Sequence, residues 1–272
     1  MGSPERDGSR VSARRNWLAG VAATIVAGVV LATASALINH EVNGGSKPTV
    51  STTTEPKSPL QIDAGLSTTY SQKFVMVGRT SAPMPNPASL SRSCFTAHRT
   101  LVDAGAYDTV TNVTLTLHGA RAAGVVINDM RAHVVHRSPL TSDLSFACAS
   151  EGELSPYKVG FDLDDDLPVA RELRSVDPPA FGAPFFEKKS LHVAAGEDVR
   201  VDVAAVGLAA SYEWDLDVVA VIGGKPQTIR VDNNGKPFRT APLTDAVTQR
   251  WHRPADAGQP WTDCPGTAGC TP

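Results

Sequence analysis

The residues best suited to chemistry in this sequence are its four cysteines, Cys94, Cys148, Cys264 and Cys270. All four follow an apolar segment that predicts export, and an even number of cysteines in an oxidising compartment predicts two disulfides. Three pairings are possible. We favour Cys94–Cys148 and Cys264–Cys270, because the loop closed by the second pair contains proline and two glycines, which let it turn back. A zinc site is the alternative, but the sequence lacks the close Cys pairs or spaced His that zinc needs, so we assign no metal or cofactor.

The densest acidic cluster is Asp162-Leu163-Asp164-Asp165-Asp166. Calcium takes several oxygen ligands, so a carboxylate-rich loop is a candidate calcium site. The EF-hand spacing fails, however, because Leu167 stands where that loop requires glycine. We favour the alternative: a strand whose alternate Asp side chains face water, followed by an acidic turn before Pro168.

Motifs of known enzymes are absent or incomplete. Ser155-Pro156-Tyr157-Lys158 matches the SxxK nucleophile motif, but that motif needs a helix N-terminus, and Pro156 with the alternating residues after it favours a loop into a strand. His133 and His136 are three residues apart, which places them on opposite faces of the predicted strand. There is no GxSxG, HExxH or P-loop sequence. A dispersed Ser/His/Asp triad stays open, since triads are recognised by geometry. We assign no catalytic or cofactor-binding residues, and an enzyme is the less favoured class.

An uncharged run from Trp17 to Ile38 follows Arg14 and Arg15 near the start of the chain. A helix of this length, at about 1.5 Å per residue, covers a bilayer core of about 30 Å. Arginines before it predict a cytoplasmic N-terminus and an extracytoplasmic C-terminal domain. We favour an uncleaved single-pass anchor, because the run is longer than a signal peptide needs. A Sec or Tat signal cleaved near Ala36, which would release a secreted protein, is the alternative.

Charge limits the kind of partner. The chain has 272 residues, with 25 basic and 28 acidic side chains. Four basic and two acidic residues precede Trp17, which leaves 21 basic and 26 acidic residues in the rest, a net charge of −5. A mildly acidic exported part argues against nucleic acid and against docking on anionic lipid. We expect the membrane as the partner of the N-terminal helix, and an unidentified protein or cell-wall partner for the domain.

Composition shifts divide the chain into five parts. These are a cytoplasmic basic tail at 1–16, the transmembrane segment at 17–38, a Ser/Thr/Pro-rich linker at 39–70, an extracytoplasmic domain at 71–240 and a Pro/Gly-rich C-terminal tail at 241–272. The tail contains Trp251 and Trp261, and these are candidates for a ligand-contacting surface because we expect no core there. Tyr212 and Trp214 lie on the inward phase of a strand and are expected in the core.

Periodicity predicts the fold of the domain. Apolar residues recur at helical spacing across Ala88–Val102, and Gly105 can end that helix. Later segments alternate apolar and polar residues with a period of two, as at 113–118, 199–203 and 212–218. Asn233-Asn234-Gly235 and Gly223-Gly224-Lys225 are typical of tight turns. We predict a mainly β domain, an antiparallel β-sandwich with one short helix, preceded by an N-terminal transmembrane helix.

The stretch from Cys94 to Thr240 resembles uncharacterised actinobacterial membrane-anchored or secreted β-rich proteins with no assigned activity. The segments that carry this resemblance are Ser93-Cys94-Phe95-Thr96-Ala97-His98, Gly105-Ala106-Tyr107-Asp108, Met130-Arg131-Ala132-His133-Val134-Val135, Phe161-Asp162-Leu163-Asp164, Tyr212-Glu213-Trp214 and Gly235-Lys236-Pro237-Phe238-Arg239-Thr240. The resemblance implies an envelope location and a β-rich domain. It implies no activity and no functional residues.

These observations favour a membrane-anchored extracytoplasmic β-sandwich that acts as an interaction or sensing module. Two alternatives remain. An exported hydrolase with a dispersed active site predicts a pocket in which a His is hydrogen-bonded to Ser or Asp. A passive cell-envelope structural protein predicts no defined partner.

Overall fold

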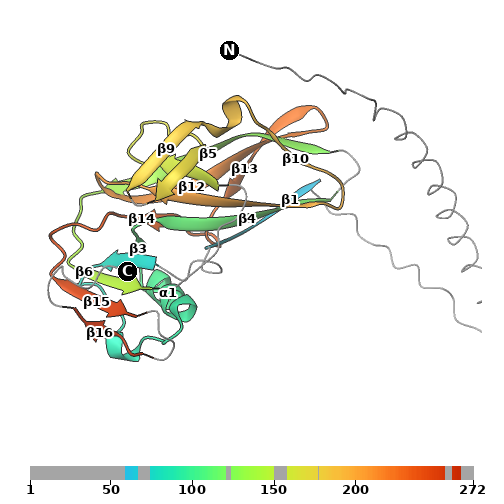
Figure 1. Cartoon of the computed structure of the whole chain (residues 1–272). Helices are drawn as coiled ribbons and strands as arrows, with labels where there is room; N and C mark the ends of the chain where they lie inside the picture. The colour runs from blue at the N-terminus through green and yellow to red at the C-terminus, as the bar shows by residue number, and fades with distance from the viewer. Residues whose placement is uncertain are drawn as a thin grey trace, which may run out of the picture. The chain divides into compact units, whose positions relative to one another are not determined.

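The computed structural model describes residues 59–66, 74–120, 124–149, 158–176, 178–254 and 259–264 (Figure 1). All of them belong to one compact unit, Glu55–Pro272. The predicted transmembrane segment at 17–38 lies outside these ranges, and within them no helix is long and apolar enough to cross a membrane.

Two β-sheets and one α-helix make up the described part of the chain, as the prediction of a mainly β domain with one helix required. The first sheet contains, in spatial order, β1 (Leu60–Leu66), β4 (Thr111–Gly119), β11 (Asp198–Val206), β7 (Lys158–Asp162), β8 (Arg171–Val176) and β9 (Pro179–Pro184). The second contains β10 (Leu191–Val193), β5 (Val125–Ser138), β12 (Ser211–Ile222), β14 (Phe238–Thr240), β3 (Tyr107–Asp108), β2 (Phe74–Gly78), β6 (Leu144–Cys148), β15 (Gln249–Arg253) and β16 (Thr262–Asp263), with β13 (Lys225–Val231) paired to β12. Short 3₁₀ turns occupy Pro87–Ser89 and Phe185–Glu187.

The sheets are mixed, so the prediction of purely antiparallel pairing is wrong. Three neighbouring pairs run parallel: β7 with β11, β3 with β14, and β6 with β15. Members of each pair are separated by long stretches of chain, which parallel pairing requires because a short hairpin joins only antiparallel strands. The alternation of residues along one strand does not indicate whether that strand runs parallel or antiparallel to a neighbour that is distant in the sequence.

The main core lies between the first sheet and the half of the second sheet that contains β5 and β12. Along β12, buried residues alternate with partly exposed ones from Tyr212 to Ile222, and Tyr212 and Trp214 are buried as predicted. A second core lies in the other half of that sheet, where α1 (Cys94–Asp103) packs beside β2 and β6 (Figure 1). Its buried residues are Met76, Leu90, Cys94, Ala97, Leu101, Ala106, Leu144, Phe146, Cys148 and Trp261.

The helix begins later than the sequence predicts. Ser93 is its N-cap and accepts a hydrogen bond from the Thr96 amide, so α1 starts at Cys94 rather than at Ala88. It ends as expected: Gly105 has φ 92°, and the amides of Gly105 and Ala106 return to the carbonyls of Val102 and Leu101.

The folded domain extends beyond the expected boundaries at 71 and 240. β1 lies within the expected linker and pairs with β4 from Leu60 to Leu66, because its apolar residues alternate with polar ones and cover one side of the main core. After 240, β15 runs beside β6, and Trp261 is buried, with its indole N–H donating to the Ser91 carbonyl at 3.0 Å. Trp261 therefore serves the second core rather than a ligand surface.

His118 connects three strands on the outer side of the first sheet. From β4 its ring reaches Asp198 of β11 at 2.5 Å and Asp63 of β1 at 3.1 Å. The hydrogen bond to Asp198 is the largest cause that raises the pKa of His118, and Asp63 adds to it.

We expect His118 to make stability depend on pH. A raised folded-state pKa contributes stability that is complete below the unfolded value of about 6.5 and is lost as pH rises through the folded value. In the wild type, the urea concentration at the midpoint of unfolding should therefore fall as pH rises from about 6 to about 8.5. In His118→Gln this fall should be smaller. Urea unfolding of both proteins across this range tests the prediction, with His192→Gln as the control, because His192 is the exposed residue of β10. Parallel pH curves for wild type and His118→Gln would contradict it.

Candidate functional site

The structure brings a buried histidine and a buried aspartate together beside α1. His98 lies on α1, and its Nε2 is 2.8 Å from Asp108 Oδ1 in β3. The two side chains are only 7% and 6% exposed, and the His98 ring also packs edge-on against Phe74. Asp108 thus fixes the orientation of the imidazole, and among the described residues nothing hydrogen-bonds to His98 Nδ1.

His98 lines a cleft of about 610 Å³ that we call the α1 cleft. The described residues that line it come from three separate parts of the chain: the end of β1, one face of α1 and the turn between β13 and β14. The lining residues are Gly65, Leu66, Phe95, His98, Arg99, Val102, Asp103, Asn233, Asn234 and Lys236. The five residues from α1 recur at helical spacing and therefore share one face of the helix.

The turn at the cleft is held by its own hydrogen bonds. The Asn233 amide donates to the Lys236 carbonyl at 2.8 Å, and the Gly235 amide donates to Asp232 Oδ1 at 2.7 Å. Asn234 and Gly235 both have positive φ, 55° and 83°, as the Asn-Gly pattern predicts. The turn is therefore a fixed support for the polar side chains of Asn233, Asn234 and Lys236.

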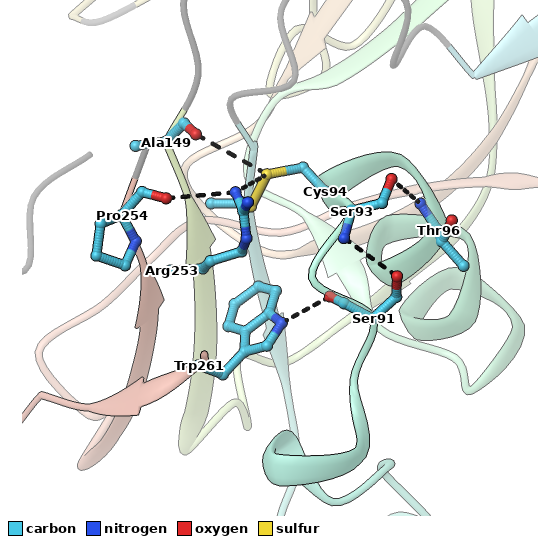
Figure 2. The surroundings of a disulfide bond; sticks show 9 residues. Ser91, Ser93, Cys94, Thr96, Ala149, Arg253, Pro254 and Trp261 are labelled. Atoms are coloured by element: carbon cyan, nitrogen blue, oxygen red, sulfur yellow. Dashed lines mark hydrogen bonds between the residues drawn. A yellow bond between two sulfur atoms is a disulfide. The ribbon is translucent and has the colours of Figure 1, made fainter. Parts of the chain in front are cut away.

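The disulfide Cys94–Cys148 forms, as predicted, and joins the N-terminus of α1 to the end of β6 (Figure 2). Its Cα atoms are 6.0 Å apart, and both cysteines are buried. Cys264 is also disulfide-bonded. Its expected partner, Cys270, lies outside the described residues, so the pairing Cys264–Cys270 stays a prediction.

An arginine is buried against this disulfide. Arg253 Nη1 lies 3.2 Å from Cys94 Sγ and 3.7 Å from Cys148 Sγ, and it donates to the Pro254 carbonyl at 3.3 Å (Figure 2). Arg253 is 7% exposed, and its Nε makes no hydrogen bond within the part of the chain that the structure describes. Arg253 therefore packs β15 onto the disulfide without a carboxylate partner among those residues.

The acidic cluster at 162–166 has a structural use. Asp164 accepts hydrogen bonds from the amides of Leu208 and Ala209, at 2.7 and 3.0 Å, and from the Tyr212 hydroxyl. Burial alone would raise the pKa of Asp164, but these hydrogen bonds outweigh it and hold that pKa below its usual range. Burial and the bond to Asp164 raise the pKa of Tyr212 to about 12. Asp164 thus ties the turn after β7 to the turn before β12.

Asp164→Ala should lower the free energy of unfolding by about 3 kcal/mol at pH 7, because two amides and a hydroxyl lose a charged acceptor. The depressed pKa means that the carboxylate stabilises the fold above the unfolded pKa and that this stability is lost as pH falls. Urea unfolding measures the effect. The exposed neighbour Asp166 provides the control, since Asp166→Ala should change stability by less than about 0.5 kcal/mol. Equal effects of the two variants would refute this role.

The prediction that His133 and His136 lie on opposite faces of a strand is wrong. They pair with Asp215 and Glu213 of β12, and a bulge in β5 inserts Val135 between them. Because of this extra residue, His136 points to the same side of the sheet as His133. Both imidazoles therefore share the outer face with those two carboxylates. Within the described residues, no group of three or more His, Cys, Asp or Glu is arranged to hold a metal ion. Ser155 of the SxxK motif lies outside those residues.

The α1 cleft offers binding groups rather than a complete catalytic set. Cationic, amide, imidazole and apolar side chains meet there, while none of the described residues that line it is Ser, Thr or Cys. The helical spacing predicted across Ala88–Val102 includes His98, but nothing in the sequence indicates that Asp108, Asn233 or Lys236 lies near it. Neither a scan against protein-family models nor a search of curated proteins finds a match for this chain.

Proposed function

We propose that this chain is a membrane-anchored extracytoplasmic binding module whose ligand occupies the α1 cleft. The observation that carries this proposal is the cleft itself, a concave site of about 610 Å³ lined by charged, amide and apolar side chains from three parts of the chain. Ligand sites are concave, of this size, and combine apolar walls with a few polar groups. The predicted N-terminal anchor places the cleft outside the cell, where it meets proteins, wall components and small solutes.

The alternative of an exported hydrolase gains support from one contact, His98 Nε2 to Asp108 at 2.8 Å in the wall of a cleft. An Asp-oriented imidazole is the base of many hydrolases. We rank this function second because no hydroxyl or thiol nucleophile is among the described residues that line the cleft, so His98 would have to activate a water molecule. The hydrogen bond between His98 and Asp108 holds α1 against β3, and this structural role is enough to explain why the pair is buried.

Three measurements test the proposal. Protease treatment of intact cells should digest the domain and leave the N-terminal segment protected. N-terminal sequencing should return the intact N-terminus, whereas a start just after Ala36 would indicate the secreted form. The purified chain should hydrolyse no ester, amide or phosphate in a broad substrate panel. If the wild-type chain hydrolysed a substrate and His98→Gln did not, the hydrolase would be supported and the binding module rejected.

A further inference from the structure

The charges of the α1 cleft differ from those of the rest of the exported chain. Arg99 comes from α1 and Lys236 from the 233–236 turn, while Asp103 is the only carboxylate among the described lining residues. Neither Arg99 nor Lys236 makes an ion pair with any described residue, whereas six other described cations do: Arg131, Arg171, Lys189, Arg200, Arg230 and Arg239. Two unpaired cations facing one hollow, in a domain of net negative charge, attract an anion locally.

The cleft also has an apolar part. Leu66, Phe95 and Val102 line it, and Phe95 is 47% exposed although α1 has a well-formed buried face. An exposed aromatic ring on the rim of a concave site offers a large contact area for a ligand at a small loss of side-chain entropy. Asn233 and Asn234 add amide groups that can donate or accept hydrogen bonds.

From this combination we infer that the α1 cleft binds a small amphipathic anion, a carboxylate attached to an apolar group. The inference rests on the proposed function and specifies its ligand. Arg99 and Lys236 donate charge-assisted hydrogen bonds to the carboxylate, and the apolar group packs on Phe95 and Val102. Asp103 and the surplus of acidic side chains in the domain disfavour polyanions, since two cations cannot offset many negative charges.

Isothermal titration calorimetry with N-acetyl-L-phenylalanine and N-acetyl-L-phenylalanine amide tests the inference. The two probes share the apolar ring and differ in the negative charge. With the full chain in an uncharged maltoside detergent, we expect the acid to bind about tenfold more tightly than the amide, because only the acid engages both cations. Equal dissociation constants, or no heat from the acid at millimolar concentration, would overturn the inference.

Variants locate the site. Lys236→Gln and Arg99→Gln should each weaken binding of the acid about fivefold to tenfold and leave the amide unchanged. Phe95→Ala should weaken both probes alike, and Asp103→Asn should tighten binding of the acid. Lys225→Gln removes a lysine of β13 that is also exposed but lies outside the cleft, and should change neither affinity. A loss in Lys225→Gln as large as in Lys236→Gln would refute the placement.

The two proposals fail in different ways. An extracytoplasmic chain without turnover that binds neither probe would disprove the ligand class and leave the binding module standing. A cytoplasmic domain, or hydrolysis that depends on His98, would disprove the module whatever the probes do.

Discussion

Replacing both Cys94 and Cys148 with alanine is expected to lower the free energy of unfolding by about 4 kcal/mol, the loop-entropy value for cysteines separated by some 54 residues. The bond closes a loop that contains α1, β3, β4 and β5, so its loss frees a large part of the unfolded chain. Urea unfolding of the oxidised wild type and the double variant measures the difference.

The control for this prediction keeps the disulfide and changes its neighbour. Arg253→Met preserves the bulk of the side chain against the sulfur atoms and removes a buried charge that has no described carboxylate partner. Replacing a buried charge with an apolar side chain is often nearly neutral, so we expect a change below about 1 kcal/mol. If the double alanine variant also changed stability by less than about 1 kcal/mol, the disulfide would not constrain the unfolded chain as the loop-entropy argument assumes.

The parts of the fold that the sequence predicts are those set by local periodicity. In β4 and in the 212–218 part of β12, alternation of apolar and polar residues fixes which side chains face the core, because a strand presents every second residue to one face. Trp214 and Leu216 are accordingly buried. Turn residues are equally informative at Asn234 and Gly235, where positive φ follows from residue type.

The start of α1 shows why periodicity alone overextends a helix. Leu90 is buried and lies four residues before Cys94, which continues the helical pattern backwards. Its burial comes from a turn after Pro87, not from helix, and the Ser93 side chain caps the helix afterwards. A buried residue at the right spacing is compatible with either conformation, so the cap is the more specific signal.

The bulge at Val135 could not be predicted, because it depends on how β5 pairs with β12. One inserted residue moved His136 onto the face of His133, and nothing in the pattern of residues 133–136 indicates it. The α1 cleft was missed for a related reason. Leu66, Phe95 and Asn233 are far apart in sequence, and only long-range strand pairing brings their segments together.

Trp214→Ala should lower the free energy of unfolding by about 4 kcal/mol, as for other large-to-small changes at fully buried sites. Trp214 is 0% exposed, and its ring centroid lies 4.9 Å from that of Phe238 and 6.4 Å from that of Phe161. Phe161 belongs to the first sheet and Trp214 to the second, so the indole fills the space between them. Thermal and urea unfolding measure the loss, and the exposed Leu167→Ala provides a control expected to be nearly neutral.

A milder variant separates the two contributions of Trp214. Its indole N–H donates to Thr240 Oγ1 at 2.9 Å, and Thr240 also hydrogen-bonds to Thr111 at 2.7 Å. Trp214→Phe keeps most of the packing and removes the indole donor, while Thr240 retains its bond to Thr111, so we expect a cost of about 1–2 kcal/mol. Since Thr111 lies in β4 and Thr240 in β14, the indole extends a polar link between the sheets as well as filling the core. A Trp214→Phe variant as unstable as Trp214→Ala would show that the hydrogen bond, and not the buried volume, carries the stabilisation.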